Sequence, residues 1–120
     1  MTNILIVDDE GPLRTLLKSE LEQYNFDIDT AENGEIALKK LRDKRFELTI
    51  LDIRMPGMDG LEVLKIIRNE NLSDKVIMLT GVDELKIARD SLQMGANDFL
   101  TKPYEIKTLL ACIKRVIEEK

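Results

Sequence analysis

"LTILDIRMPGMDG" (residues 48–60) decides the predicted fold, because it leads from a buried strand into a turn through an acidic residue. Residues 48–51 are apolar or β-branched, which is typical of a strand covered on both faces. Asp52 follows directly, and Pro56 with Gly57 prevents any regular element from continuing. An acid in this place is either a simple turn residue or part of a site, and the ends of the other strands decide between these interpretations.

Short apolar runs alternate with amphipathic segments along the whole chain. Leucines spaced as in a helix occupy residues 13–21, and a similar apolar stripe runs through residues 106–117. Alternating strands and helices with short connections predict an α/β protein with a parallel sheet and helices on both faces. We therefore expect a flavodoxin-like (βα)5 three-layer sandwich with strand order 2-1-3-4-5 and a ligand site between strands one and three. The predicted strands are residues 4–7, 26–31, 48–51, 76–79 and 98–101.

Single residues mark several helix boundaries. Pro12 suits the first turn of the first helix, and Asn33 and Asp59 are good caps for the second and third. Gly95 suits a left-handed stop after the fourth helix.

Composition excludes several classes of function. The chain has 120 residues, which predicts one domain over residues 1–120, and a net charge of −5, which argues against direct binding to nucleic acid. The sequence contains no apolar run long enough to span a membrane, and its first residues do not resemble a signal peptide. We therefore expect a cytoplasmic protein. With no histidine and only Cys112, which we expect to be buried, zinc sites and Ser-His or Cys-His catalysis are excluded. Any bound metal must have oxygen ligands, as Mg²⁺ prefers.

Acids, a hydroxyl and an ammonium stand at four predicted strand ends. Asp8 and Asp9 end the first strand, Asp52 the third, Thr80 the fourth and Lys102 the fifth. These side chains meet at one edge of a parallel sheet, where the crowded carboxylates repel one another unless a cation lies among them. Taken singly, each is an ordinary turn, cap or surface residue; taken together, they predict a magnesium site. A carboxylate there can attack phosphorus and form an aspartyl phosphate.

Four motifs, "ILIVDDE", "LDIRMPGMDG", "LTG" and "GANDFLTKP", resemble those of the response-regulator receiver domain of two-component signalling. The resemblance covers essentially the whole chain, whose length is similar to that of single-domain regulators of chemotaxis and sporulation phosphorelays. It implies a phosphoprotein that signals in a two-component system or phosphorelay. Such a domain is not a conventional enzyme, although it catalyses its own phosphorylation and dephosphorylation.

The resemblance implies a role for each residue of this edge. Asp52 accepts the phosphoryl group, and Lys102 pairs with its oxygens. Mg²⁺, for which Mn²⁺ can substitute, is bound by Asp8, Asp9, Asp52 and the backbone carbonyl of Arg54.

The resemblance also implies a switch and two partners. Thr80 and Phe99 are expected to transmit phosphorylation, while the bond before Pro103 is expected to be cis. The donor is a sensor histidine kinase or a histidine phosphotransfer protein. The downstream protein target binds the surface of the fourth helix, the fifth strand and the fifth helix. Gly81 departs from the alanine usual in this family, which leaves the energetics of switching open.

Two alternatives use a similar fold or chemistry. A phosphatase of the haloacid-dehalogenase type needs a second Asp two residues after its nucleophile, where this chain has Arg54. A flavin carrier needs a phosphate-binding loop after strand one, where "DDEGPL" would repel a phosphate.

Arg54 and Val82, which follow the acceptor Asp52 and Thr80 by two residues, are expected to flank the water that attacks the aspartyl phosphate. Because neither can act as a base, we expect slow dephosphorylation.

Overall fold

The computed structural model describes residues 1–119. Over this range the chain alternates between strands and helices, with one short 3₁₀ turn before the fourth helix. The strands are β1 (Asn3–Val7), β2 (Asp27–Ala31), β3 (Phe46–Asp52), β4 (Ser73–Thr80) and β5 (Asp98–Thr101). The helices are α1 (Gly11–Glu22), α2 (Gly34–Asp43), α3 (Gly60–Glu70), α4 (Leu85–Gln93) and α5 (Ile106–Glu118), and η1 is Val82–Glu84.

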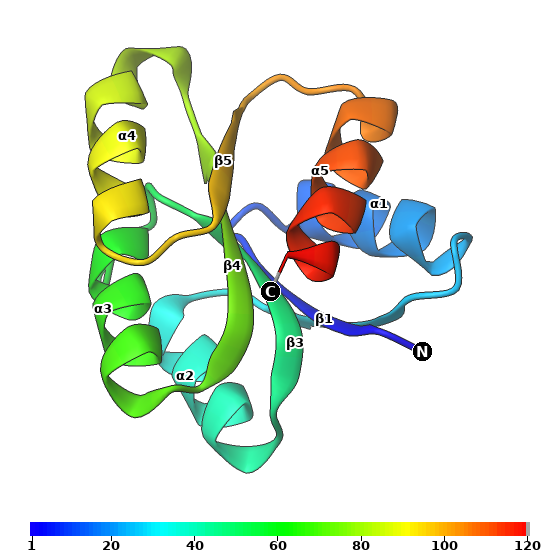
Figure 1. Ribbon diagram of the computed structural model, residues 1–120, viewed down its shortest axis with the longest axis horizontal. Coiled ribbons are helices and arrows are strands. Elements are labelled where there is room, and N and C mark those ends of the chain that lie inside the picture. The colour runs from blue at the N-terminus through cyan, green and yellow to red at the C-terminus, as the bar shows by residue number, and fades with distance from the viewer. Residues whose placement is uncertain (120) are drawn as a thin grey trace.

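The strands form one parallel sheet in the order β2-β1-β3-β4-β5 (Figure 1). This confirms the predicted flavodoxin-like topology. Val7 at the end of β1 pairs with Leu51 of β3, one residue before Asp52. The acidic residues that follow Val7 therefore lie beside Asp52, at the point where the strand order reverses.

Two apolar cores, one on each face of the sheet, make the three layers. Figure 1 shows α1 and α5 on one face of the sheet and α2, α3 and α4 on the other. Alternate residues of a strand point to opposite faces, so Ile4 and Ile6 pack toward α1 and α5, whereas Leu5 and Val7 pack toward α2, α3 and α4. The residues of β1 from Ile4 to Val7 are fully buried. Both faces of the central strands are covered, which explains why they read as continuous apolar runs.

β3 and β4 begin two and three residues earlier than the sequence indicated, and a buried serine joins their starts. β4 starts at Ser73, whose hydroxyl donates to the Phe46 carbonyl oxygen at 3.0 Å and accepts from the Thr49 hydroxyl at 3.0 Å. A serine satisfied in this way can be buried at little cost. The predicted starts at residues 48 and 76 were therefore wrong by two and three residues.

The predicted helix boundaries are confirmed where capping contacts define them. Asn33 Oδ1 accepts from the Ile36 amide at 2.8 Å, and Asp59 Oδ1 accepts from the Glu62 amide at 2.9 Å. Gly95 follows α4 with φ +108°, a left-handed conformation that side chains disfavour.

The loop after β3 is held close to the sheet by backbone contacts. The Ile53 amide donates to the Leu79 carbonyl at 2.9 Å, and the Gly60 amide donates to the Ile53 carbonyl at 2.8 Å. Any side chain at position 60 would collide with the Asp52 carbonyl oxygen and with Ile53 Cα. Gly60 thus allows α3 to start directly against the end of β3, which fixes the backbone that carries Asp52.

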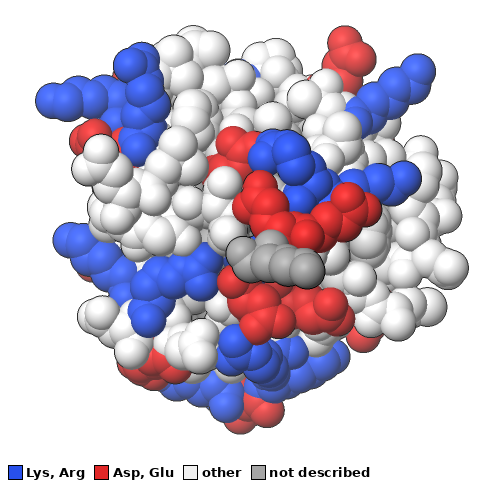
Figure 2. All heavy atoms as spheres, in the orientation of Figure 1, with Lys and Arg blue, Asp and Glu red and all other residues white. Residues whose placement is uncertain are grey.

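The surface carries charges of both signs. Figure 2 shows acidic side chains gathered around the middle of the face in view, with lysine and arginine side chains in several separate groups around them. Within residues 1–119, no helix is both long enough and apolar enough to cross a membrane.

Candidate functional site

Three carboxylates converge at the carboxyl edge of the sheet, as the sequence predicted. One carboxylate oxygen from each of Asp8, Asp9 and Asp52 lies within 4.8 Å of the other two. We call these three residues the acid cluster. Asp8 and Asp52 are buried, whereas Asp9 is exposed. Glu10, which the sequence left without a metal role, stands outside the acid cluster.

Local contacts orient Asp8. Its Oδ1 accepts from the Glu10 amide at 2.9 Å, and its carbonyl oxygen accepts from Arg14 Nη1 of α1 at 2.7 Å. The Asp8 amide donates to the Ala31 carbonyl of β2 at 3.2 Å. Contacts with α1 and β2, and one within the turn itself, thus fix the turn in which the β1 acids lie.

Lys102 joins the acid cluster from the end of β5. Its Nζ lies 2.9 Å from Asp52 Oδ2 and 3.3 Å from Asp8 Oδ2. Its amide donates to the Thr80 carbonyl at 2.7 Å, and its bond to Pro103 is cis, as expected from the resemblance. Burial opposes the ammonium charge, but the contacts with Asp52 and Asp8 outweigh burial and raise the pKa of Lys102.

Burial dominates the electrostatics of Asp52. It raises the pKa of this carboxyl to about 6, against the opposing effects of the Lys102 contact and the Arg54 amide. The buried carboxylate is therefore costly in the absence of a second cation.

The donor set fits a divalent cation. The Lys102 ammonium contacts two of the three carboxylates, those of Asp8 and Asp52, so one positive charge stands against three acids in the acid cluster. Oxygen ligands from carboxylates are those that Mg²⁺ prefers. The backbone carbonyl of Arg54, the fourth ligand expected, stays a prediction.

The contacts that the structure gives for the side chains of Thr80 and Phe99 lie outside the acid cluster. Thr80 is fully buried. Its hydroxyl donates to the Gly81 carbonyl oxygen at 3.1 Å, and the Glu84 carbonyl oxygen is a second, more distant acceptor at 3.5 Å. Phe99 is partly buried against the core shared by α2, α3 and α4. Both roles as switch residues therefore stay predictions.

One contact beside the site was missed by sequence reasoning. The side chain of Arg54 turns to η1, where its Nε donates to Glu84 Oε2 at 2.9 Å. Glu84 is only 8% exposed, although it lies in a polar run, "VDE", that suggests a solvated turn. No spacing rule connects residues 54 and 84, so only the folded chain reveals the pair.

Cys112 is buried, as predicted. Burial raises the pKa of its thiol to about 12, and the Sγ donates to Asp98 Oδ2 at 3.3 Å. A thiol in this state is a core residue rather than a nucleophile.

Comparison with known proteins identifies the family. A family model described as "Response regulator receiver domain" matches residues 4–114. The alkaline phosphatase synthesis transcriptional regulatory protein PhoP of Bacillus subtilis is 40% identical over 114 residues, covering 95% of this chain and 48% of that protein. ResD of the same organism is 38% identical over 116 residues, covering 97% of this chain and 48% of its own length. The chain thus spans about half the length of these relatives.

Solved structures agree with the fold and with the family. The response regulator TrrA of Thermotoga maritima, solved in complex with Mg(2+)-BeF, is 41% identical with a TM-score of 0.86, over 97% of this chain and 99% of that one. The chemotaxis protein CheY4 of Vibrio cholerae is 31% identical with a TM-score of 0.90, over 97% and 98% of the two chains.

The chain belongs to the response regulator receiver domain family, and its function is that of a receiver in two-component signalling. The resemblance noted in the sequence is thereby confirmed. The haloacid-dehalogenase alternative finds no support in these relatives.

The raised pKa of Asp52 makes a prediction about stability in metal-free buffer. Its pKa in the folded chain, about 6, exceeds the ordinary 3.8, so the protonated form stabilises the fold. That contribution is complete below pH 3.8 and is lost as the pH rises through about 6. Asp52→Asn should therefore raise the free energy of unfolding by about 1–3 kcal/mol at neutral pH, and the gain should vanish near pH 4.

Urea unfolding across this pH range, in the presence of a chelator, measures the effect. Asp43→Asn, an exposed site at the end of α2, is the matched control and should change stability by less than about 0.5 kcal/mol. Equal effects of the two substitutions at neutral pH would contradict a burial cost at Asp52.

Proposed function

We propose that Asp52 accepts a phosphoryl group from a phosphohistidine on a sensor histidine kinase or a histidine phosphotransfer protein. The observation that carries the proposal is the contact of the Lys102 ammonium with Asp52, inside a cluster of three carboxylates. A carboxylate oxygen of Asp52 attacks phosphorus, a P–O bond forms and the P–N bond to the imidazole breaks. The bonding electron pair returns to the imidazole nitrogen, which is protonated from solvent.

Different residues of the site would bind the metal and the phosphoryl group. Asp8, Asp9 and Asp52, with the carbonyl of Arg54, would bind Mg²⁺ or Mn²⁺. The bound cation would neutralise charge on the transferring oxygens. Lys102 is close enough to Asp52 to pair with the phosphoryl group once it is attached. In the same way the domain would catalyse its own phosphorylation from a small donor. It would also catalyse the hydrolysis of the aspartyl phosphate, which we expect to be slow.

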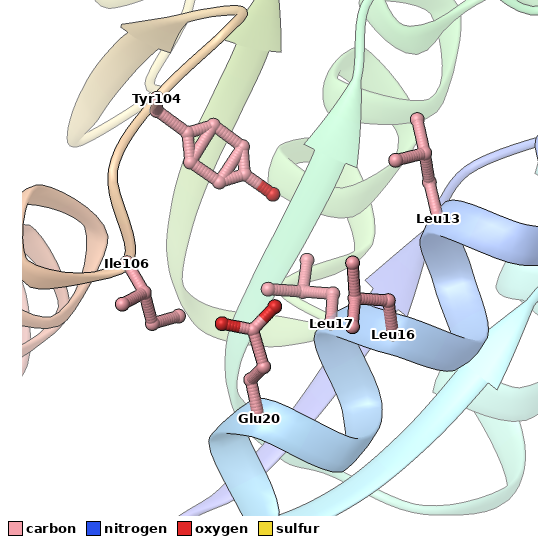
Figure 3. A pocket seen from close by; sticks show the side chains of 6 residues that line it. All are labelled: Leu13, Leu16, Leu17, Glu20, Tyr104 and Ile106. Atoms are coloured by element: carbon pink, nitrogen blue, oxygen red, sulfur yellow. The ribbon is translucent and has the colours of Figure 1, made fainter.

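The partner that delivers the phosphoryl group needs a surface beside the site. A groove between α1 and the start of α5 begins at Asp8 and Lys102 and is lined by Leu13, Leu16 and Tyr104. Figure 3 shows the leucines of α1 on one side of this groove and Tyr104 and Ile106 on the other, with Glu20 at its end. Leu13 and Leu16 are 42% and 55% exposed, although their spacing matches that of buried helix positions.

Exposed leucines beside the acid cluster fit an apolar partner helix that places its histidine over Asp52. The groove adjoins the site at Lys102, so a bound helix would lie within reach of the acceptor. We assign this groove to the phosphodonor protein.

The downstream protein target would bind the surface formed by α4, β5 and α5. A cytoplasmic location and the absence of direct nucleic acid binding stay predictions for this domain. PhoP, one of the relatives, is named a transcriptional regulatory protein, and this chain spans 48% of its length.

The acceptor and the metal can be tested together with acetyl phosphate and intact-mass measurement. The wild type should gain one phosphoryl group with Mg²⁺ and none in excess chelator, whereas Asp52→Asn should gain none. Asp9→Ala should raise the Mg²⁺ concentration required by about tenfold or more, because a direct ligand is lost. The neighbouring Glu10→Ala, outside the acid cluster, is the control and should behave as the wild type. A phosphorylated Asn variant would exclude Asp52 as the acceptor.

The groove can be tested by comparing donors. Leu16→Ser should slow transfer from a histidine phosphodonor protein by about tenfold, because it removes exposed apolar contact area. Phosphorylation by acetyl phosphate should not change. Tyr24→Ser is the matched control, since Tyr24 is a similarly exposed apolar residue (51% against 55%) outside the groove. Loss of both reactions would show a damaged site, and loss of neither would exclude this groove as the docking surface.

The switch can be tested with beryllofluoride, a stable phosphoryl mimic, in amide NMR spectra. In the wild type, shift changes should extend over residues 80–110, because Thr80 and Phe99 lie on β4 and β5. Thr80→Ala should confine them to the residues around Asp52. Thr30→Ala on β2 serves as the control and should leave the wild-type pattern. Changes confined to the acid cluster in the wild type itself would contradict the switch.

A further inference from the structure

Glu84 is a buried acid that the proposed function does not use. The two oxygens of its side chain are both engaged: Oε1 accepts from the Gly81 amide at 3.2 Å, and Oε2 accepts from Arg54 Nε at 2.9 Å. Its exposed neighbour Asp83 lies farther from the guanidinium, at 3.9 Å from Arg54 Nη2. Glu84 is thus the main anionic partner of Arg54 in the described part of the chain.

Arg54 starts beside the phosphoacceptor and turns away from it. Its amide nitrogen lies 3.3 Å from Asp52 Oδ1, so its side chain is attached close to the place of a phosphoryl group on Asp52. The side chain itself is 72% exposed and directed to η1. A guanidinium is well suited to bind either a carboxylate or a phosphoryl group, and its flexible stem allows it to exchange one for the other.

We propose that Glu84 is a positioning residue that keeps Arg54 turned away from Asp52 in the unphosphorylated domain, and that the phosphoryl group competes with Glu84 for the same guanidinium. The inference rests on the proposed function, because it requires a phosphoryl group on Asp52. The phosphoryl group brings a second set of anionic oxygens close to where Arg54 begins. Arg54 then leaves η1 for Asp52.

The transfer of Arg54 has a consequence for η1. Once Arg54 has left, the Gly81 amide is the partner that Glu84 keeps, and a carboxylate that is 8% exposed without a cationic partner moves toward solvent. Because η1 ends at Glu84 and α4 starts at Leu85, this movement shifts the start of α4.

The Thr80 hydroxyl is held on the same segment, by the carbonyls of Gly81 and Glu84. Two of the groups expected to reach the phosphoryl group, Thr80 and Arg54, are therefore engaged by residues 81–84 before it arrives. Their release from one short segment couples the two movements.

The experiment measures the affinity for beryllofluoride at fixed Mg²⁺, with the Gly81 amide signal as the readout. Glu84→Gln keeps the shape and the contact with the Gly81 amide but removes the charge that holds Arg54. It should raise the affinity by about threefold to tenfold, since breaking the pair no longer opposes binding. Asp83→Asn removes an equal charge from the same turn and should change the affinity by less than about twofold.

Arg54→Gln separates this effect from general electrostatics. In that background Glu84→Gln should leave the affinity unchanged, because the guanidinium for which the two anions compete is gone. A gain that persists in the Arg54→Gln background would overturn the proposal, as would an effect of Glu84→Gln no larger than that of Asp83→Asn. A wild-type protein that binds no beryllofluoride would instead contradict the proposed function.

Discussion

The contact between Lys102 and Asp52 is the interaction on which the rest of the site depends. It joins the ends of β5 and β3, two strands that are not neighbours in the sheet, across the end of β4. One ammonium stabilises two buried carboxylates, and Lys102 also contacts Asp8. Burial nevertheless raises the pKa of Asp52 to about 6, because the shared ammonium offsets only part of the cost of burying this carboxylate. Three acids with one ammonium form a donor set that fits a divalent cation.

The predictable part of the molecule is the part governed by periodicity and by strand ends. Continuous apolar runs placed the five strands, and the topology of a parallel sheet then brought Asp8, Asp9, Asp52 and Lys102 to one edge. Caps such as Asn33 and Asp59 were visible because their contacts span only three residues. The polar start of β4 was not predictable, since Ser73 is stabilised by partners far away in the sequence.

Side-chain direction was beyond sequence reasoning. Leu13 and Leu16 match the spacing of a buried helix face, yet only Leu17 and Leu21 of that stripe reach the core. Glu84 lies in a segment that looks solvated, yet it is buried because an arginine thirty residues earlier in the chain accompanies it. In both cases the missing information is which neighbour the fold supplies, and a single-sequence pattern does not contain it.

The two separate cores have a consequence for how such a domain can change. The groove lies over the core shared by α1 and α5, whereas Phe99 packs on the core shared by α2, α3 and α4, from the opposite face of the sheet. Under the proposed function, substitutions at Leu13 or Leu16 would therefore alter which donor is recognised without repacking the core against which Phe99 lies. A duplicated copy of this gene could acquire a new upstream partner first and a new output later. The sheet between the cores thus makes signalling specificity separable from signalling mechanism during evolution.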